Sequence, residues 1–158
     1  MNYLPVSLNV NKKHVLIAGG GKAALEKLQM LRKFNCQVTV VGEELSSEIH
    51  LEIKKEITQS GCSHHLREFC RDDLEGVFLV YACNSDREIN RFIKREANAL
   101  GILVNTPDDP ELCDFLTPAL FSEGPMMVAV SSGGTDVRKT ILWRNRIKQL
   151  FSDNGIKP

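Results

Sequence analysis

HVLIAGGGKAALEK, residues 14–27, leads an apolar strand pattern directly into three glycines and then into helix-forming sequence. We expect the helix to begin near Lys22 and to run to about Phe34, followed by a second strand at Gln37–Val41. A strand, a tight glycine turn, a helix and a further strand in this order indicate an α/β fold with a parallel sheet.

The glycine turn fits the dinucleotide fingerprint G-x-G-x-x-G/A, with Gly19, Gly21 and Ala24 at its small positions. Gly19 permits the tight turn, Gly21 lets a pyrophosphate approach the backbone, and Ala24 keeps the helix close to the strand. The helix N-terminus would direct free N–H groups and the positive end of its dipole at that phosphate. The pattern predicts dinucleotide binding, and a purely structural turn is the alternative.

The length, net charge and apolar pattern of the chain indicate which classes of protein it can belong to. The chain has 158 residues, enough for one domain with a small appendage and a sizeable core. Its formal net charge is zero, so no overall field draws it to nucleic acid or membrane. No apolar run approaches the length of a transmembrane helix, and the N-terminus lacks a signal-peptide pattern. We therefore predict a cytoplasmic protein with no nucleic-acid or membrane partner.

The cysteines and histidines give no metal-site pattern. Five cysteines are dispersed without a C-x-x-C pair, at Cys36, Cys62, Cys70, Cys83 and Cys113. Such a set indicates reduced thiols. His64 and His65 are adjacent, and neighbours in an extended segment point to opposite faces, so their imidazoles would not converge on one ion. The sequence predicts no metal site.

The chain alternates strands and helices as far as Asn105. We predict a helix over Ser46–Gln59, a short strand over His64–Glu68, a buried strand over Val77–Ala82, a helix from an Asp86 cap to about Leu100, and a strand over Ile102–Asn105. Gly101 would end the helix before the last strand. This alternation implies right-handed crossovers and a Rossmann-type, doubly wound parallel sheet.

After Asn105 the alternation stops, at a group of four prolines: Pro107, Pro110, Pro118 and Pro125. We place a dinucleotide-binding domain over residues 1–112 and a small α+β segment over 113–158. An isolated strand at Met126–Ser131 and one amphipathic helix after it could not bury their apolar surface alone. A second copy would supply the partner, so we predict a homodimer built from roughly Cys113 to Phe151.

Ligands of doubly wound sheets bind beyond the carboxyl ends of the strands. The segments Gly19–Ala23, Cys83–Asp86 and Asn105–Asp109 should therefore share one crevice. Asp108 and Asp109 are adjacent carboxylates in a proline-bounded loop, and each is a candidate for acid–base work. If both lay close together and away from water, the pair would have a raised proton affinity. The alternative is that both residues are turn formers.

Six segments, in register from about Leu4 to Thr135, resemble the precorrin-2 dehydrogenase/sirohydrochlorin ferrochelatase family, the siroheme synthase domain. They are LPVSL, HVLIAGGGKAALEK, QVTVVG, YACNSDREIN, ILVNTPDDPELCDFLTPAL and GPMMVAVSSGGT. The resemblance implies NAD-dependent oxidation of precorrin-2, a tetrapyrrole, to sirohydrochlorin. It also implies a homodimer, with the tetrapyrrole pocket lying between the NAD domain and the dimer segment. It leaves open whether Fe²⁺ is then inserted as a second substrate.

The resemblance also implies residue roles. Asp108 falls on the family's general base. The residues expected to bind the cofactor are Gly19, Gly20, Gly21, Lys22, Ala23, Glu43, Glu44, Ala82 and Cys83. Glu43 and Glu44 follow the second strand, where an acid can accept from the adenosine ribose hydroxyls, and no arginine follows to pair with a 2′-phosphate. This arrangement favours NAD over NADP.

The substrate would be held by Asn105, Ser132 and Arg138, the last in a basic helical stretch suited to a polycarboxylate. A solvated charged face is the alternative for that stretch. The chain departs from the family pattern at Glu26, Asn84 and Val137. A non-catalytic dinucleotide-binding module, acting as a redox sensor or a partner subunit, is the alternative function. Asp108 together with SSGGT favours the enzyme.

Overall fold

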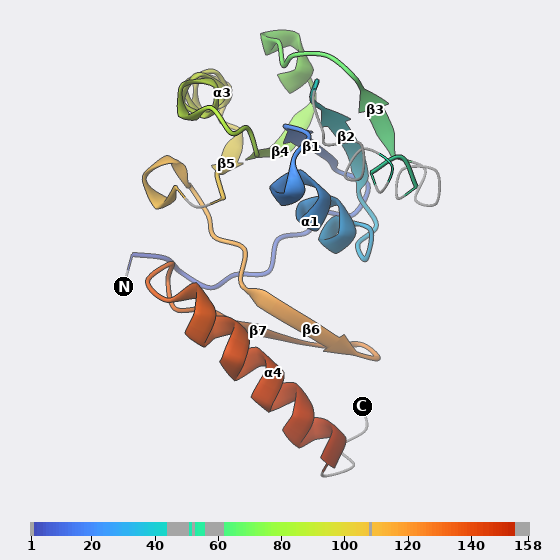
Figure 1. Cartoon of the computed structure of the whole chain (residues 1–158), viewed down its shortest axis with the longest axis vertical. Coiled ribbons are helices and arrows are strands. Elements are labelled where there is room, and N and C mark those ends of the chain that lie inside the picture. The colour runs from blue at the N-terminus through green and yellow to red at the C-terminus, as the bar shows by residue number, and fades with distance from the viewer. Residues whose placement is uncertain (1, 44–50, 52, 56–61, 108, 154–158) are drawn as a thin grey trace. The chain divides into compact units, whose positions relative to one another are not determined.

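The computed structural model describes residues 2–43, 51, 53–55, 62–107 and 109–153. The chain forms two compact units, and Figure 1 draws the elements of both. One unit is Val6–Phe115, and the other joins Met1–Pro5 to Leu116–Pro158. This division falls three residues after the boundary placed at 112–113, and it assigns the N-terminal residues to the C-terminal unit.

The Val6–Phe115 unit contains a five-stranded parallel sheet in the order β3-β2-β1-β4-β5. Its elements are β1 (His14–Ala18), α1 (Lys22–Leu31), β2 (Gln37–Val41), β3 (Ser63–His65), β4 (Val77–Ala82), α3 (Arg87–Ala99) and β5 (Leu103–Asn105). The chain runs outward from β1 to β3 and then returns to β4 beside β1. Because the order reverses between β1 and β4, their carboxyl ends open a crevice. The predicted Rossmann-type fold is confirmed.

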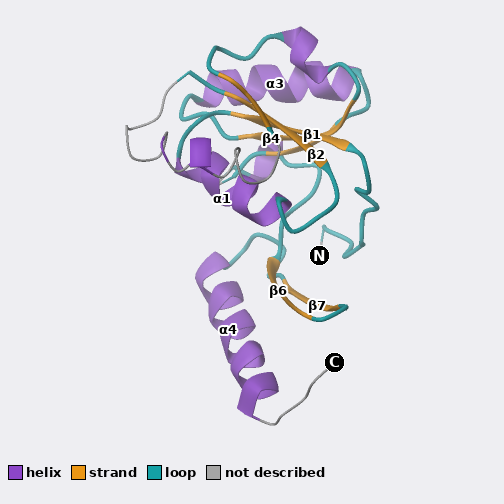
Figure 2. Cartoon of the chain, turned by 90° about the vertical axis from the view of Figure 1, so that its right-hand side faces the viewer, coloured by secondary structure: helices purple, strands orange, loops and turns teal. Residues whose placement is uncertain are grey.

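Helices α1 and α3 lie on opposite faces of the sheet (Figure 2). Successive side chains of β1 therefore point to opposite faces of the sheet and pack in two separate cores. Val15 and Ile17 pack in the core that includes α1, whereas Leu16 and Ala18 pack in the core that includes α3. All four side chains are fully buried, and each large aliphatic one contributes about 1.5–3 kcal/mol of transfer free energy. The continuous apolar character of β1 follows from this two-sided burial.

Helix α1 ends at Leu31, three residues before the predicted end. The N–H of Lys33 donates to the carbonyl of Met30, and the N–H of Phe34 donates to that of Leu31. These bonds span three residues instead of four, so they tighten the last turn and stop the α-helix.

Strand β3 ends at His65, where the prediction extended it to Glu68. The N–H of Arg67 donates to the carbonyl of His65 over 3.0 Å, which turns the chain away from the sheet. Most of the predicted helix over Ser46–Gln59 lies outside the described residues. Within it, Leu51 and residues 53–55 are helical, and Ile53 is fully buried.

Both predicted ends of α3 are confirmed. The carboxylate of Asp86 accepts from the N–H of Glu88 over 2.8 Å and caps the helix. Gly101 follows the C-terminus with φ +72°, a conformation that L side chains rarely adopt.

The C-terminal unit contains a β-hairpin, β6 (Ala119–Glu123) and β7 (Met126–Val130), and the helix α4 (Val137–Asp153), which packs against both strands. Strand β7 is thus paired, and the prediction of an isolated strand was wrong. The ring of Phe121 meets that of Phe151 edge-on with centroids 5.8 Å apart, which ties the hairpin to α4. None of the described helices is long and apolar enough to cross a membrane.

Candidate functional site

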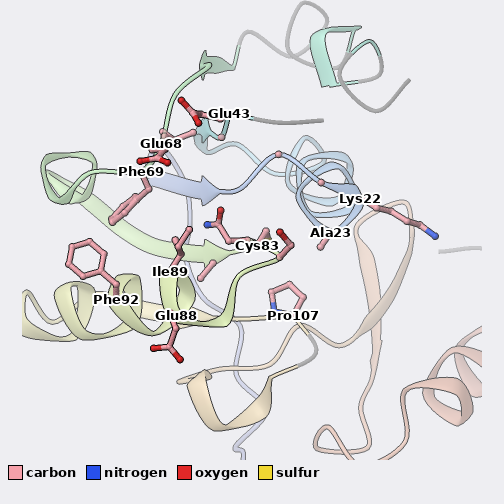
Figure 3. Close-up of a pocket in the computed structure, with 17 residues that line it drawn as sticks. Lys22, Ala23, Glu43, Glu68, Phe69, Cys83, Glu88, Ile89, Phe92 and Pro107 are labelled. Carbon is pink, nitrogen blue, oxygen red and sulfur yellow. The ribbon is translucent and has the colours of Figure 1, made fainter. Parts of the chain in front are cut away.

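A cavity of about 690 Å³ lies at the carboxyl ends of β1, β2 and β4 (Figure 3), within the size range of small-molecule sites. Its walls come from five parts of the sheet unit and one proline: Gly20–Ala23 after β1, residues 41–43 at the end of β2, Glu68 and Phe69 after β3, residues 82–85 after β4, Glu88, Ile89 and Phe92 of α3, and Pro107. Two of the three segments predicted to share a crevice, Gly19–Ala23 and Cys83–Asp86, therefore line this cavity with most of their residues.

The glycine turn combines tight packing with open space. Gly19 has φ +131°, and a Cβ built on it would lie 2.4 Å from the carbonyl oxygen of Cys83. A side chain there is excluded by the close approach of the turns after β1 and β4. A Cβ on Gly21 would meet nothing within 4 Å, so the missing side chain leaves room at the cavity wall.

Gly42 is a second glycine required by packing, and sequence reasoning did not single it out. A Cβ there would lie 2.6 Å from the backbone carbon of Gly19 and 2.7 Å from the nitrogen of Gly20. The end of β2 therefore closes directly onto the glycine turn. The only sequence signal is a glycine immediately after the apolar strand.

The N-terminus of α1 is suited to an anion. Gly21 is the N-cap residue, and neither a side-chain cap nor an acidic residue of the first turn satisfies the leading N–H groups of the helix. These donors and the helix dipole would hold a pyrophosphate at the cavity wall. The turn therefore fits a dinucleotide. Lys22 and Ala23 line the cavity as predicted, and the Lys22 side chain extends outward in Figure 3.

The loop after β4 is fixed by two asparagines. The backbone N–H of Asn84 donates to the Asn90 side chain over 3.1 Å, and the Asn90 amide donates back to the Asn84 carbonyl over 2.9 Å. The Asn84 amide also donates to the carbonyl of Ala18. Asn84, a departure from the family pattern, thus has a structural role, and Asn90 was missed by sequence reasoning.

Ala82 and Cys83 are buried and line the cavity. Burial raises the pKa of the Cys83 thiol to about 12, so this thiol stays protonated at neutral pH. Cys83 therefore contributes to the wall of the cavity as a protonated thiol.

Acidic side chains outnumber basic ones around the cavity. Glu43 lies at its rim after β2, whereas Glu44 lies outside the described residues. Glu68 and Glu88 also line it, and sequence reasoning singled out neither. Among the described lining residues the only basic side chain is Lys22.

The loop after β5 contributes less than predicted. Of its described residues only Pro107 lines the cavity. Asn105 is buried and donates to the carbonyl of Phe115 over 2.9 Å. Its Oδ1 and the Oγ1 of Thr106 are buried and have no hydrogen-bond partner among the residues that the structure describes. Asp108 lies outside the described residues, so its role as a base remains a prediction.

Asp109 itself does not have the raised proton affinity expected if it lay close to Asp108 and away from water. Its partner in that expectation, Asp108, lies outside the described residues. The Asp109 carboxylate accepts from the Arg87 guanidinium at 2.6 and 3.2 Å. These hydrogen bonds lower the pKa of Asp109. The nearby positive charge, which the sequence did not reveal, reverses the expected direction of the shift for this carboxyl.

Ser132 and Arg138 belong to the C-terminal unit. The Ser132 hydroxyl accepts from the N–H of Asp136 over 2.9 Å, and the Asp136 carboxylate accepts from the N–H of Lys139, which caps α4. Arg138 is exposed. Their contact with a substrate remains a prediction. In the described part of the chain, no group of three or more His, Cys, Asp or Glu residues could hold a metal ion.

Comparisons with known proteins agree with this geometry. The chain is 38% identical to a siroheme synthase of Methylobacillus flagellatus over 151 residues and 35% identical to that of Nitrosomonas europaea over 152. Each alignment covers 96% of this chain, but only 32% and 31% of those relatives, so the chain spans about a third of their length.

Among solved structures, the chain is similar to "SirC, precorrin-2 dehydrogenase", with a TM-score of 0.77 and 26% sequence identity, over 96% of this chain and 70% of that one. A family model described as "Putative NAD(P)-binding" matches residues 6–119, which include the whole sheet and the glycine-turn cavity. The chain therefore belongs to this NAD(P)-binding family.

Proposed function

We propose that this chain is an NAD-dependent dehydrogenase that oxidises precorrin-2 to sirohydrochlorin. The observation that carries the proposal is the cavity at the glycine turn, in a chain similar to SirC, precorrin-2 dehydrogenase, over nearly its whole length. The similarity to siroheme synthases supports the same pathway chemistry. Location in the cytoplasm remains the prediction made from the sequence.

The turn after β1 and the N-terminus of α1 would hold the pyrophosphate, and Glu43 would accept from the adenosine ribose. Ala82 and Cys83 would pack beside the bound cofactor. NAD, when bound, supplies a hydride acceptor. The chain would exclude water from the reacting faces and hold the two ligands in contact.

The oxidation removes a hydride and a proton from the tetrapyrrole. The hydride goes to NAD, and we propose Asp108 as the group that receives the proton. A well-placed base contributes about 10²–10⁴-fold to such a step. Its neighbour Asp109 is engaged by Arg87, which supports the choice of Asp108.

We propose residues 1–112 as the cofactor domain and 113–158 as the segment for dimerisation and substrate binding. Asn105, Ser132 and Arg138 would contact the tetrapyrrole carboxylates or ring. Exposed basic side chains along α4 support a polycarboxylate ligand. We propose Fe²⁺ as a second substrate, for insertion into sirohydrochlorin after the oxidation.

The test is anaerobic incubation of the chain with precorrin-2 and NAD, with formation of sirohydrochlorin and NADH followed by absorbance. We expect both products in equal amounts, since one hydride leaves per molecule oxidised. Tight NAD binding with no turnover would overturn the proposal in favour of a dinucleotide-sensing module. Adding Fe²⁺ after the oxidation tests the insertion step separately.

A further inference from the structure

Two glutamates reach the same end of the cavity from neighbouring strands. Strands β2 and β3 are parallel, with Val41 opposite His65. The N–H of Gly42 donates to the carbonyl of His65 over 3.1 Å and continues the pairing past the end of β2. Glu43 and Glu68 follow within three residues, and both line the cavity (Figure 3). Two carboxylates therefore face the part of the cavity next to β2.

The arginine closest in sequence is held by another acid. Arg67 donates from Nη1 and Nη2 to the Asp73 carboxylate at 2.8 and 2.5 Å, and from Nη1 to the backbone carbonyl of Glu68 at 2.9 Å. Asp73 also accepts from the N–H of Cys70, which fixes the carboxylate in place. This two-point pairing uses the guanidinium face that would otherwise suit a phosphate.

The two nicotinamide cofactors differ at this end of the site. The acid after the second strand of such folds takes the adenosine ribose, whose hydroxyls donate to a carboxylate. The extra 2′-phosphate of NADP replaces a hydroxyl that can donate, and it carries a charge of about −1.5 to −2 at neutral pH. It would meet like charges, with no arginine among the described lining residues to offset them.

We propose that Glu68 is a second specificity-determining residue, which acts with Glu43 to select NAD against NADP, while Asp73 holds Arg67 away from the ribose. This inference rests on the NAD binding proposed above, and it extends that proposal from one acid to two. Glu68 acts on the cofactor through charge, and Asp73 is a positioning residue that acts through Arg67.

The experiment measures the dissociation constants of NAD and NADP by calorimetry for the parent, Glu68→Gln and Glu43→Gln. We expect Glu68→Gln to tighten NADP binding by about fivefold or more, as removal of one exposed like charge allows, and to change NAD binding by less than about threefold. The variant that carries both Glu43→Gln and Glu68→Gln should bind NADP more tightly than either single variant. Asp73→Asn should also improve NADP binding, because it releases Arg67.

Glu88→Gln is the matched control. Glu88 lines the same cavity from α3, where it pairs with Arg91. Its substitution should leave the ratio of NAD to NADP affinity unchanged. An unchanged ratio in Glu68→Gln would overturn the inference while NAD binding by the parent still stood. A parent that binds neither cofactor would overturn the proposed function itself.

Discussion

Arg87 holds Asp109 at two points, with Nε 2.6 Å from Oδ2 and Nη2 3.2 Å from Oδ1. The same guanidinium reaches the Glu111 carboxylate at 2.8 Å. The first turn of α3 is thereby tied to the loop after β5. Because Arg87 lowers the pKa of Asp109, this carboxyl is ionised and paired at neutral pH. It is poorly placed to accept a proton from a substrate.

The first prediction concerns the pH dependence of this pair. A carboxyl with a lowered folded-state pKa contributes stability above its unfolded pKa and loses that contribution as pH falls through the folded value. Arg87→Gln should therefore lower the free energy of unfolding at pH 7, and the difference from the parent should shrink below about pH 4. Urea denaturation at both pH values measures it. Arg95→Gln, on the same helix but paired with Glu96, should not show this pattern through Asp109.

The second prediction separates the two aspartates. Asp108→Asn should abolish oxidation of precorrin-2, because an amide cannot take the proton, and should leave the NAD dissociation constant within about threefold. Asp109→Asn should keep most of the turnover, since its partner is Arg87. Turnover of Asp108→Asn at the parent rate would move the base elsewhere in the site.

The third prediction compares two glycines of one turn. Gly21→Val should fold normally, because a Cβ there meets nothing within 4 Å, yet it should lose NAD affinity by placing a branched side chain at the pyrophosphate. Gly19→Ala should instead destabilise the fold by about 1–3 kcal/mol or more, since its Cβ would overlap the Cys83 carbonyl at positive φ. Thermal unfolding and calorimetry distinguish the two effects. Retained affinity in a folded Gly21→Val protein would contradict the pyrophosphate assignment.

The elements that the sequence predicted well carry local signals. Strand β1 and the start of α1 are marked by the apolar run and the glycine spacing, and Asp86 and Gly101 have the residue types of a cap and a stop. The required glycine at Gly42 could not be inferred, because the clash that requires it is with Gly19, far back along the chain.

Separation along the chain also explains why the sequence did not predict the main ion pair of the loop after β5. Arg87 and Asp109 are 22 residues apart, so only the fold shows that the carboxylate is paired. Strand β6 was missed because its segment, between two prolines, forms a strand only through antiparallel pairing with β7. Long-range contacts thus account for most of what the sequence did not predict.

The fourth prediction concerns Cys113, whose sulfur contacts the backbone on both sides of Asp108. Its Sγ lies 3.2 Å from the carbonyl oxygen of Thr106 and 3.4 Å from that of Asp109, and it accepts from the N–H of Thr106. Partial burial raises the pKa of the Cys113 thiol, so it remains a donor at neutral pH. Cys113→Ala should lower stability by about 1 kcal/mol and lower kcat without changing the NAD dissociation constant.

Cys113→Ser provides the control, since a hydroxyl keeps a donor and an acceptor at the same place. It should recover part of the lost kcat. Equal kcat values for the parent and Cys113→Ala would show that these contacts do not position the loop for catalysis.

The last prediction concerns assembly through α4. None of its described residues is buried, and its exposed apolar side chains include Ile141, Leu142, Trp143 and Leu150. Trp143 is 55% exposed and is the only tryptophan of the chain, so its fluorescence reports on this helix alone. If two copies pair through this surface, light scattering at micromolar concentration should give a dimer, and dilution should shift the emission of Trp143 to longer wavelength as water reaches the ring.

Leu142→Asp should produce a folded monomer, because one charge at the centre of an apolar interface is costly to bury, whereas Lys139→Gln on the same helix should leave the dimer intact. A parent chain that is monomeric at all concentrations, with folded-state circular dichroism, would contradict the proposed homodimer.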